Sequence, residues 1–570
     1  MTTNTNKDDN MLTLPELTNK ILERNSTHSD ECDATDFKKM TSRVLDVMKL
    51  PRLDNEDDAV SILRYSIINK EHICIASDYD SDGLNAAAIA YRGLTILHPF
   101  VTTIVNHRKD GNGFNPVLMD NIKKLHDSRP IDVLITVDHG SSNKDELMAL
   151  KEYGIKKVII TDHHDIPPDN RPDAEDSTID VFINPHKSPN QPTGYCGGGV
   201  IFKILCNLFT PGSKDMNKYL SSCLPHAACA TVGDVMGMDI WYNRQIVNAG
   251  IQYMNSDTLL WRKLITALNI PGKIHTRHIG YVLCPFINTG NRSNTEQLFY
   301  DILVNEPTAP IDDLIAMGVQ HNINRKAVRV KISSVVEDRV AREGVDKSVT
   351  TIIDCELAIA GIIANQIGET YNVPAVCFAL DKDKRQYNGS ARAVLPYINI
   401  VEVFRTIDKL SPGVFIKYGG HKGAGGCSVP YDKYEEFKTL FNKVVGDVPV
   451  PPDVDKELSP IELTGMDITP GLVDIIDLAG PYGKNWPAPV FKTRVTVKMV
   501  RLFKTMGIME VATNTGMVVS CTMFYNKDLS KDLVEYICER GKSVTITYEP
   551  QHYKRGNKTS LSFMVSNVEE

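Results

Sequence analysis

Three short apolar runs in the first third of the chain each end next to acidic residues, and this pattern constrains the fold more than any other feature. The runs and the acids that follow them are residues 73–76 with Asp78, residues 133–137 with Asp138, and residues 158–161 with Asp162. Stretches with helical spacing, residues 85–97 and 144–153, separate the runs. Strand, helix and strand repeated in this order are typical of a parallel sheet covered by helices on both faces. The sequence therefore predicts an α/β domain.

The acidic residues should gather at one edge of that sheet. Ligands of such sheets bind outside the carboxyl ends of the strands, which is where all three runs meet their acids. In the first acidic stretch Asp78, Asp80 and Asp82 occupy alternate positions, so in an extended segment they point the same way and repel one another unless a cation compensates them. Oxygen ligands of this kind favour Mg²⁺ or Mn²⁺. For this stretch alone, a solvated acidic turn that caps a helix is the alternative.

Two histidines extend the expected site. His163 and His164 follow Asp162 directly at the end of the third run, and a mixed oxygen and nitrogen set suits Mn²⁺, with Mg²⁺ and zinc as competitors. Either histidine alone would be interpreted as structural, but their place beside two other acidic strand ends favours a metal site. Asp162 is a candidate for orienting an imidazole. One more carboxylate, Asp234, follows the small-residue run 230–233.

A glycine-rich turn, residues 194–199, leads into an apolar helix. Backbone amides of such a turn can hold a phosphate at the helix N-terminus. Tight packing between elements is the alternative. The turn lacks the Gly-Lys-Ser/Thr ending of a nucleoside triphosphate loop, so ATP is not expected as a ligand.

Length and composition exclude several classes of protein. At 570 residues the chain is too long for one core, and about 150 residues per domain gives three or four units. Neither a signal peptide nor an apolar run near the roughly 20 residues of a membrane span is visible, so a cytoplasmic protein without membrane contact is expected. The twelve cysteines are scattered without a CxxC pair, which predicts neither disulfides nor a zinc site. The net charge of −8 decides little about nucleic acid, because it does not describe a local basic groove.

Four motifs make the chain resemble a known superfamily. They are residues 78–83, 138–140, 162–164 and 231–234, and in this order they resemble the motifs of the DHH phosphoesterase superfamily, and within it those of the RecJ exonuclease family. The resemblance implies two divalent ions, Mn²⁺ or Mg²⁺, and a set of ligands made up of Asp80, Asp82, Asp138, His163 and Asp234. It also implies that His164 faces the scissile phosphate, which makes Asp138, His163 and His164 the candidate catalytic residues.

Two further positions of the site follow from the same resemblance. Asp78 is expected to cap the helix or to support a ligand from behind, and Asp162 to support a ligand in the same way. Ala76 stands where many DHH enzymes have a histidine, which implies fewer protein ligands and more water for one of the two ions.

Two arginines are candidates for binding substrate phosphate. Residues 106–108 and 111–114 resemble a RecJ loop whose arginine, here Arg108, meets phosphate, and residues 288–292 resemble more loosely a stretch that ends in Arg292. A guanidinium can bind phosphate through two parallel hydrogen bonds. Ordinary surface ion pairs are the alternative for both side chains.

A second unit follows a helical stretch that Pro307 and Pro310 interrupt. Residues 389–392 and 418–426 resemble the DHHA1 domain, and the matching positions expected to bind nucleotide or phosphate are Ser390, Arg392, Gly420 and His421. Glycines there allow a backbone to approach sugar and phosphate closely. A glycine-rich hairpin without a ligand is the alternative.

The C-terminal part has a β pattern. Residues 481–491 resemble the segment that leads into the OB-fold domain of RecJ, and four short β-patterned runs follow. Rings and positive charges interleave near the end of the chain, as on a surface that binds single strands, and the residues we predict there are Tyr548, Tyr553, Lys554 and Arg555. A solvated hairpin is the alternative.

The predicted fold class is therefore α/β, with a parallel-sheet DHH domain, a second α/β DHHA1 domain across a cleft, and a C-terminal β-barrel of the OB fold. The expected boundaries are 1–45 for a tail or peripheral helix, 46–295 for DHH, 296–342 for a helical connector, 343–447 for DHHA1 and 453–570 for the OB fold.

The expected function is that of a metal-dependent exonuclease that hydrolyses single-stranded DNA from the 5′ end, in repair, recombination or replication. The direction comes from the resemblance alone. The alternatives are a phosphodiesterase of oligonucleotides or cyclic dinucleotides, and an inactive DHH-type replication scaffold. The expected partner is single-stranded DNA, a single-strand-binding protein is a further candidate, and a monomer is expected.

Overall fold

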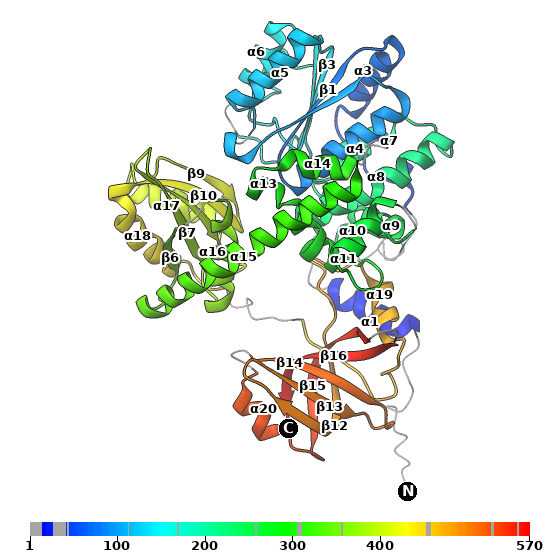
Figure 1. Cartoon of the computed structure of the whole chain (residues 1–570), viewed down its shortest axis with the longest axis vertical. Coiled ribbons are helices and arrows are strands. Elements are labelled where there is room, and N and C mark those ends of the chain that lie inside the picture. The colour runs from blue at the N-terminus through cyan, green and yellow to red at the C-terminus, as the bar shows by residue number, and fades with distance from the viewer. Residues whose placement is uncertain are drawn as a thin grey trace. The chain divides into compact units, whose positions relative to one another are not determined.

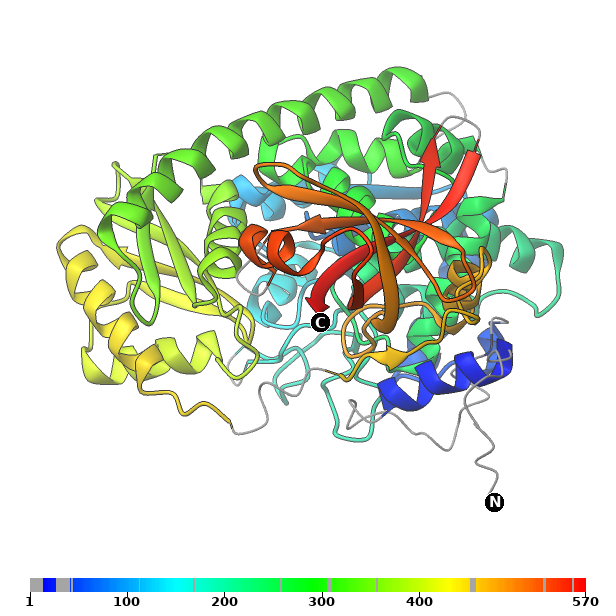
Figure 2. The ribbon, with the colours of Figure 1, turned by 90° about the horizontal axis from the view of Figure 1, so that it is seen from below.

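The computed structural model describes residues 14–26, 42, 45–111, 113–167, 170–256, 259–304, 310–354, 357–451, 458–525, 529–555 and 558–570. The chain forms two compact units, which are drawn together in Figures 1 and 2. The first comprises Met1–Asn288, Glu296–Ile315 and Leu458–Glu570, and the second comprises Thr289–Thr295 and Ala316–Glu457.

A five-stranded parallel sheet organises the N-terminal part of the first unit (Figure 1). In spatial order its strands are β2 (Val101–Val105), β1 (Ile73–Ser77), β3 (Val133–Val137), β4 (Lys157–Thr161) and β5 (Val181–Ile183). The register aligns the last residues of the three predicted strands, Ser77, Val137 and Thr161, in one row. The predicted parallel sheet is confirmed, and the two strands that the sequence did not reveal form its edges.

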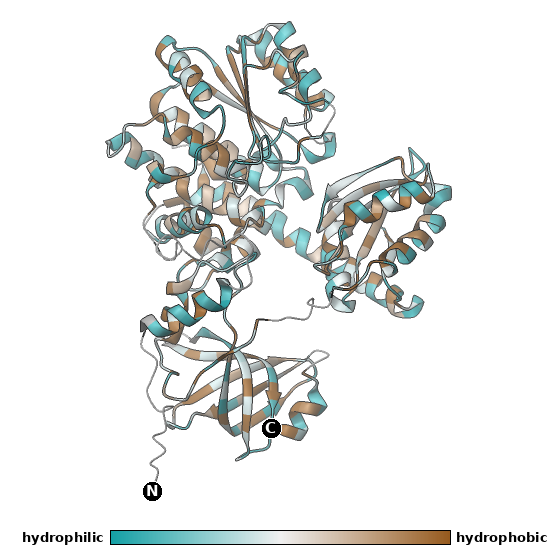
Figure 3. Cartoon of the chain, turned by 180° about the vertical axis from the view of Figure 1, so that it is seen from behind, coloured by the Kyte–Doolittle hydropathy of each residue, from teal (hydrophilic) through white to brown (hydrophobic). Residues whose placement is uncertain are grey.

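Helices cover both faces of this sheet. On one face lie α4 (Ser81–Leu97) and α7 (Gly197–Cys206), and on the other lie α5 (Pro116–Ser128) and α6 (Lys144–Tyr153). With both faces covered, the strands are apolar without interruption rather than alternating, and Figure 3 shows them mostly brown. This explains why the runs were visible in the sequence.

Further helices complete this part of the first unit. They are α1 (Leu14–Ser26), α3 (Glu56–Asn69), α8 (Lys214–Gly233), α9 (Trp241–Asn255), α10 (Leu259–Ala267), α11 (Thr276–His278), the π-helix η4 (Ile279–Leu283), α12 (Cys284–Ile287) and α14 (Glu296–Val304). Two 3₁₀ turns, η2 (Val47–Lys49) and η3 (Arg108–Asp110), complete the described elements of this part. Helix α8 packs against both α4 and α9.

The C-terminal part of the first unit is a closed barrel, as predicted. Its strands are β12 (Phe491–Leu502), β13 (Met506–Ala512), β14 (Val518–Phe524), β16 (Lys558–Glu569) and β15 (Ser543–Arg555), and β15 pairs again with β12. Strand β13 was not predicted. The short β11 (Ile461–Glu462) and the helices α19 (Leu472–Ala479) and α20 (Lys531–Ile537) accompany the barrel. Its core also takes in Leu17 and Ile21 of α1.

The second unit is built on a mixed sheet. In spatial order the strands are β6 (Val349–Ile353), β7 (Ala375–Asp381), β8 (Gln386–Arg392), β10 (Ala424–Pro430) and β9 (Lys417–His421). Successive residues of β7 enter opposite cores, since Cys377 packs with α16 (Leu357–Tyr371) and Phe378 with α17 (Ile400–Leu410) and α18 (Tyr434–Gly446). The helices α13 (Gly290–Ser293), η5 (Tyr431–Lys433) and most of α15 (Ile311–Glu343) complete this unit. It is the expected second α/β domain.

Cysteines and hydropathy add two findings. The ten cysteines within the described ranges are buried, and no disulfide joins any two of them. Among the described residues, no helix is both long enough and apolar enough to cross a membrane.

Candidate metal centre

The acids that follow β1, β3 and β4 meet at one edge of the parallel sheet. The backbone N–H of Asp78 donates to Val137 O at 3.3 Å, and that of Asp138 donates to Thr161 O at 3.0 Å, so each acid extends the parallel ladder by one hydrogen bond. Asp138 has a φ of 65°. This left-handed conformation is uncommon outside glycine, and Asp tolerates it better than most residues. It turns the chain sharply at the site.

Asp82 is fixed by the glycine-rich turn. It lies in the first turn of α4, is 2 % exposed, and accepts hydrogen bonds of 2.8 Å from the backbone N–H groups of both Gly197 and Gly198. A Cβ on Gly197 would lie 2.4 Å from Asp138 Oδ1. The turn therefore uses its amides to hold a carboxylate. Sequence reasoning left phosphate binding and packing open here and missed this role, whose only signal was a glycine run in the same domain as the acids.

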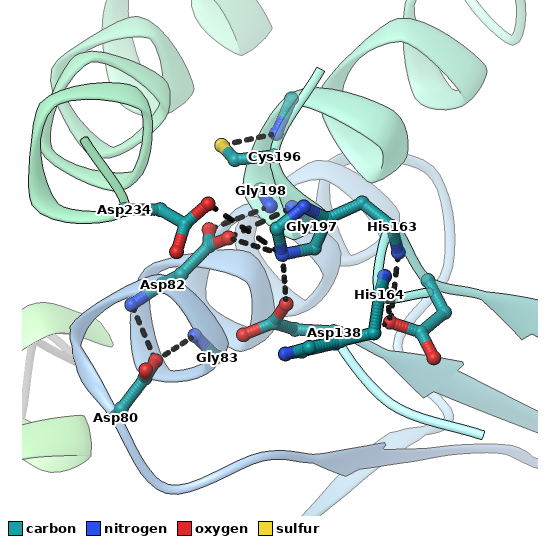
Figure 4. Close-up of polar contacts among 12 residues, drawn as sticks. Asp80, Asp82, Gly83, Asp138, His163, His164, Cys196, Gly197, Gly198 and Asp234 are labelled. Atoms are coloured by element: carbon teal, nitrogen blue, oxygen red, sulfur yellow. Dashed lines mark hydrogen bonds and ion pairs between the residues drawn. The ribbon is translucent and has the colours of Figure 1, made fainter. Parts of the chain in front are cut away.

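His163 occupies the centre of the cluster (Figure 4). Its Nε2 lies 3.2 Å from Asp138 Oδ1, 3.6 Å from Asp82 Oδ2 and 3.7 Å from Asp234 Oδ2. Asp234 reaches the centre from the C-terminal end of α8, which it caps. Four of the five predicted ligands thus converge on one point.

Asp162 orients His164. Its Oδ1 lies 2.8 Å from His164 Nδ1 and accepts the backbone N–H of His163, while its Oδ2 accepts the backbone N–H of Ser141. Burial disfavours the charged form of both side chains, but the hydrogen bonds and the opposite charges within the pair outweigh burial. As a result the pKa of Asp162 falls below its ordinary value, and the pKa of His164 rises to about 10. These contacts favour the protonated form of His164, which is suited to an anionic phosphate.

Asp80, the fifth predicted ligand, has a second role that corrects one expectation. Its Oδ1 accepts the backbone N–H groups of Asp82 at 2.8 Å and Gly83 at 3.1 Å, so Asp80 and not Asp78 caps α4. Asp78 lies with Asp80 and Asp138 in a group whose ligand atoms are within 4.8 Å of one another. Burial, followed by the charge of Asp80, raises the pKa of Asp78 to about 8.

The donor set fits divalent metal ions. Three overlapping groups have ligand atoms within 4.8 Å: Asp138 with His163 and His164, Asp82 with His163 and Asp234, and Asp78 with Asp80 and Asp138. Burial, followed by the charges of neighbouring carboxylates, raises the pKa of three aspartates. The pKa of Asp138 lies well above its ordinary value, that of Asp82 is about 6, and that of Asp234 is about 8. The buried Asp138 Oδ1 accepts no hydrogen bond within the described part of the chain. Such a crowd of carboxylates with imidazole suits Mn²⁺ or Mg²⁺.

Ala76 occupies the position where many DHH enzymes have a histidine, and its backbone carbonyl makes a contact of its own. Ala76 is fully buried in β1, and its carbonyl oxygen lies 2.9 Å from His139 Nε2. The His139 ring stacks on Phe114, and burial lowers its pKa to about 4. The His139 ring is therefore held by Ala76 and Phe114, and the lowered pKa favours its neutral form.

Arg108 lies in the same unit as the metal centre. Its backbone N–H donates to Glu296 Oε1 at 3.1 Å, and His107 Nδ1 lies 2.7 Å from Glu296 Oε2. Glu296 is fully buried, so it anchors this loop to α14. Burial raises the pKa of Tyr79, and the positive charge of Arg108 opposes this effect, which places Arg108 near the first acidic stretch. Asn112, part of the predicted loop motif, lies outside the described residues.

The remaining candidates for phosphate binding belong to the second unit. Arg292 lies in α13, which packs on α16. The register places Arg392 of β8 and His421 of β9 on either side of Ala424 of β10, so they share one face of the sheet. Arg392 Nη1 donates to Ser390 Oγ at 3.0 Å. Gly420 adjoins His421 in β9, with a φ of 138°.

Arg392 also lines a cavity of about 320 Å³ between β8, α15 and α16. A Cβ on Gly361 of α16 would lie 2.5 Å from Arg392 Nη2. The glycine thus makes room for the guanidinium.

The predicted nucleic-acid surface is wrong at Tyr548. This residue is fully buried in the barrel, stacks on Phe563 with ring centroids 3.9 Å apart, and its hydroxyl lies 3.0 Å from Thr493 Oγ1. The alternation of Val544, Ile546 and Tyr548 along β15 was the available signal for an inward position. Tyr553 is 55 % exposed. The side chains of Lys554 and Arg555 lie outside the described residues.

Comparison with protein families identifies three domains. The DHH family, N-terminal domain, matches residues 72–231, the DHHA1 domain matches residues 346–447, and the RecJ OB domain matches residues 460–567.

Curated relatives span most of the chain. The single-stranded-DNA-specific exonuclease RecJ of Salmonella typhimurium is 26 % identical over 493 residues, covering 82 % of both chains. The protein of the same name from Escherichia coli is 26 % identical over 487 residues, covering 79 % of this chain and 80 % of the relative. The crystal structure of RecJ in complex with Mn²⁺ from Thermus thermophilus has a similar fold, with a TM-score of 0.73 at 20 % identity, covering 98 % of this chain and 78 % of that chain.

Proposed function

The chain belongs to the DHH family and combines its N-terminal domain with a DHHA1 and a RecJ OB domain, and on this premise we propose that it is a metal-dependent exonuclease of single-stranded DNA. The observation that carries the proposal is the convergence of Asp82, Asp138 and Asp234 on His163 Nε2 at 3.2–3.7 Å. These residues come from four separate elements, and the relatives that share the arrangement of domains are named as single-strand exonucleases.

The residues of the cluster have distinct roles in this proposal. Asp80, Asp82, Asp138, His163 and Asp234 would hold two divalent ions, Mn²⁺ or Mg²⁺, with Asp78 beside them. When bound, such ions activate a water molecule and neutralise charge on the leaving oxygen. Charged His164, fixed by Asp162, would donate a hydrogen bond to a non-bridging phosphate oxygen. Arg108 would bind a neighbouring phosphate.

The finer assignments are also part of the proposal. We propose cleavage from the 5′ end, and phosphate or sugar binding by Arg292, Ser390, Arg392, Gly420 and His421. We propose the domain boundaries 46–295, 343–447 and 453–570, with 1–45 as a peripheral segment and 296–342 as the connector. Exposed Tyr553 would contact the strand. A monomer in the cytoplasm that cooperates with a single-strand-binding protein completes the proposal, with repair, recombination or replication as the process.

A time course of digestion tests the proposal. Single-stranded DNA and RNA, labelled at the 5′ or the 3′ end, are incubated with Mn²⁺ or Mg²⁺, and the released label is followed. The 5′ label of DNA should be released first. Earlier release of the 3′ label would refute the direction. Asp138→Asn should abolish cleavage but leave strand binding nearly unchanged, whereas Asp120→Asn, at an exposed ion pair on α5, should leave both unchanged.

The two alternatives have less support. A phosphodiesterase of dinucleotides would need the DHH and DHHA1 domains but not the closed barrel. A scaffold that has lost its chemistry would not need to retain the full set of carboxylates and imidazoles around the centre.

A further inference from the structure

Arg244 is a fully buried arginine near the start of α9, and it joins two segments that are far apart in the sequence. Its guanidinium donates to Met238 O at 3.0 Å and to the carbonyl oxygens of residues 479–481 at distances between 2.8 and 3.1 Å. It also lies over the ring of Trp486, 4.7 Å from the centroid. Arg244 therefore fastens residues 479–486, which lead into the barrel, to the segment that follows Asp234.

Two further hydrogen bonds, one between main-chain atoms and one between side chains, reinforce this junction. The backbone N–H of Met238 donates to Lys484 O at 2.8 Å, and Asn485 Nδ2 donates to Asp239 Oδ2 at 3.3 Å. The two segments thus lie side by side, with Asp234 four residues before Met238. Burial and neighbouring carboxylates raise the pKa of Asp234, and the positive charge of Lys484 opposes this rise. This effect agrees with the short distance between the two segments.

The adjacent Asn243 connects the segment after Asp234 with the glycine-rich turn that holds Asp82. This side chain is 1 % exposed, and its Nδ2 donates to Gly194 O at 2.8 Å and to Gly237 O at 3.2 Å. Gly194 opens the turn whose amides hold Asp82. Two adjacent buried side chains therefore connect both sides of the metal centre with the segment that leads into the barrel.

The segment after Asp234 needs such support. Val235, the next residue, has a φ of 55°. A β-branched residue pays a steric cost in this left-handed region, and such a conformation persists only where the surroundings determine it. The hydrogen bonds at Gly237 and Met238 are contacts from outside α8 that fix the chain directly after this strained position.

We propose that Arg244 is a positioning residue that, through Met238 and residues 479–486, keeps Asp234 in place to bind a divalent ion. The inference rests on the proposed metal centre. Residues 479–486 then support the metal centre in addition to connecting it with the barrel. Residues that support a metal ligand from behind typically change metal affinity by about 10- to 100-fold when replaced.

Titration of the metal-free full-length chain with Mn²⁺ in a calorimeter tests the proposal without any substrate. Arg244→Gln should weaken Mn²⁺ binding about tenfold. Arg244→Lys should fall between this variant and the native chain, because a lysine keeps the charge and some of the hydrogen bonds. If Arg244→Gln does not fold, Trp486→Leu removes the stacked ring instead and should weaken binding in the same direction.

Asn25→Ala is the matched control. Asn25 is also fully buried, and its Nδ2 donates to Pro487 O at 3.0 Å, a hydrogen bond to the linker that does not involve residues 234–239. This variant should lower the melting temperature but leave Mn²⁺ affinity unchanged. Equal Mn²⁺ affinity in folded Arg244→Gln and native chains would overturn the proposal, and so would equal weakening in Asn25→Ala.

Cleavage assays separate this inference from the proposed function. Arg244→Gln should need about tenfold more Mn²⁺ for half-maximal cleavage of a dinucleotide as well as of a long strand. A loss confined to long strands would mean that Arg244 only orients the barrel, and would overturn the proposal. A native chain that binds Mn²⁺ but cleaves no nucleic acid would refute the proposed function and leave the calorimetric test of Arg244 intact.

Discussion

Replacing Asp234 by asparagine should stabilise the metal-free protein while removing a metal ligand. Ligand atoms of Asp82, His163 and Asp234 all lie within 4.8 Å of one another. Two carboxylates at that distance repel each other by about 3.5 kcal/mol at an effective dielectric constant of about 20. Burial, followed by the charges of Asp82 and Asp80, accordingly raises the pKa of Asp234 from 3.8 to about 8. The native metal-free chain carries this cost, and the asparagine variant does not.

The cost depends on pH in a defined direction. Between about pH 4 and pH 8 the folded chain keeps a proton on Asp234 that the unfolded chain releases. The free energy of unfolding therefore falls as the pH rises, by about 1.4 kcal/mol per pH unit. At pH 7 the loss amounts to about 4 kcal/mol. The advantage of Asp234→Asn should be absent near pH 4 and largest near pH 8.

Thermal unfolding in EDTA and in Mn²⁺, from pH 4.5 to 8, measures this difference. A change of 3–4 kcal/mol corresponds to roughly 6–16 °C for a domain of 150–250 residues. Mn²⁺ should raise the melting temperature of the native chain strongly and that of Asp234→Asn little. Asp120→Asn, at an exposed ion pair, should change stability by less than about 1 kcal/mol. Equal melting temperatures of native and Asp234→Asn chains at pH 8 in EDTA, or a difference that does not grow with pH, would refute the reasoning.

Three further predictions concern other parts of the site and the barrel. Gly197→Ala should abolish Mn²⁺ binding, measured by calorimetry, because the new Cβ would lie 2.4 Å from a carboxylate oxygen of the centre; retained binding would mean that the turn can shift. Asp162→Asn should lower the pKa of His164 from about 10, so the cleavage rate should fall between pH 6 and pH 8 relative to the native profile, and parallel profiles would contradict this. Tyr548→Ala should lower the free energy of unfolding in urea by about 3–5 kcal/mol. Tyr548→Phe should cost about 1 kcal/mol. Folded Tyr548→Leu should leave single-strand affinity unchanged, whereas a base-stacking role would require that affinity to fall.

The parts of the fold that were predictable are those that depend on local pattern. The parallel sheet followed from apolar runs, because strands buried on both faces are apolar throughout. The gathering of Asp82, Asp138 and His163 followed from the rule that strand ends form the site. The barrel followed from short β runs, although β13 escaped notice.

The parts that were not predictable depend on contacts between distant residues. The hydrogen bond from Gly197 to Asp82 spans 115 positions, and that from Arg244 to Pro481 spans 237. No periodicity in the sequence encodes such pairs, because they arise only when separate elements pack. The error at Tyr548 has another cause: composition suggested a binding surface, while the alternation along β15 indicated the core.

Helix α1 is synthesised long before the barrel strands that it packs against. Leu17 and Ile21 are buried in the core of the barrel, and Arg24 Nε donates to Ser459 O across 435 positions. Translation proceeds at roughly 5–20 residues per second. The apolar face of α1 therefore stays without its partner strands for on the order of 20–90 s, until those strands have been synthesised. A ribosome-bound chain would present that face to chaperones throughout the folding of the DHH domain, and α1 would be among the last elements to reach its final place.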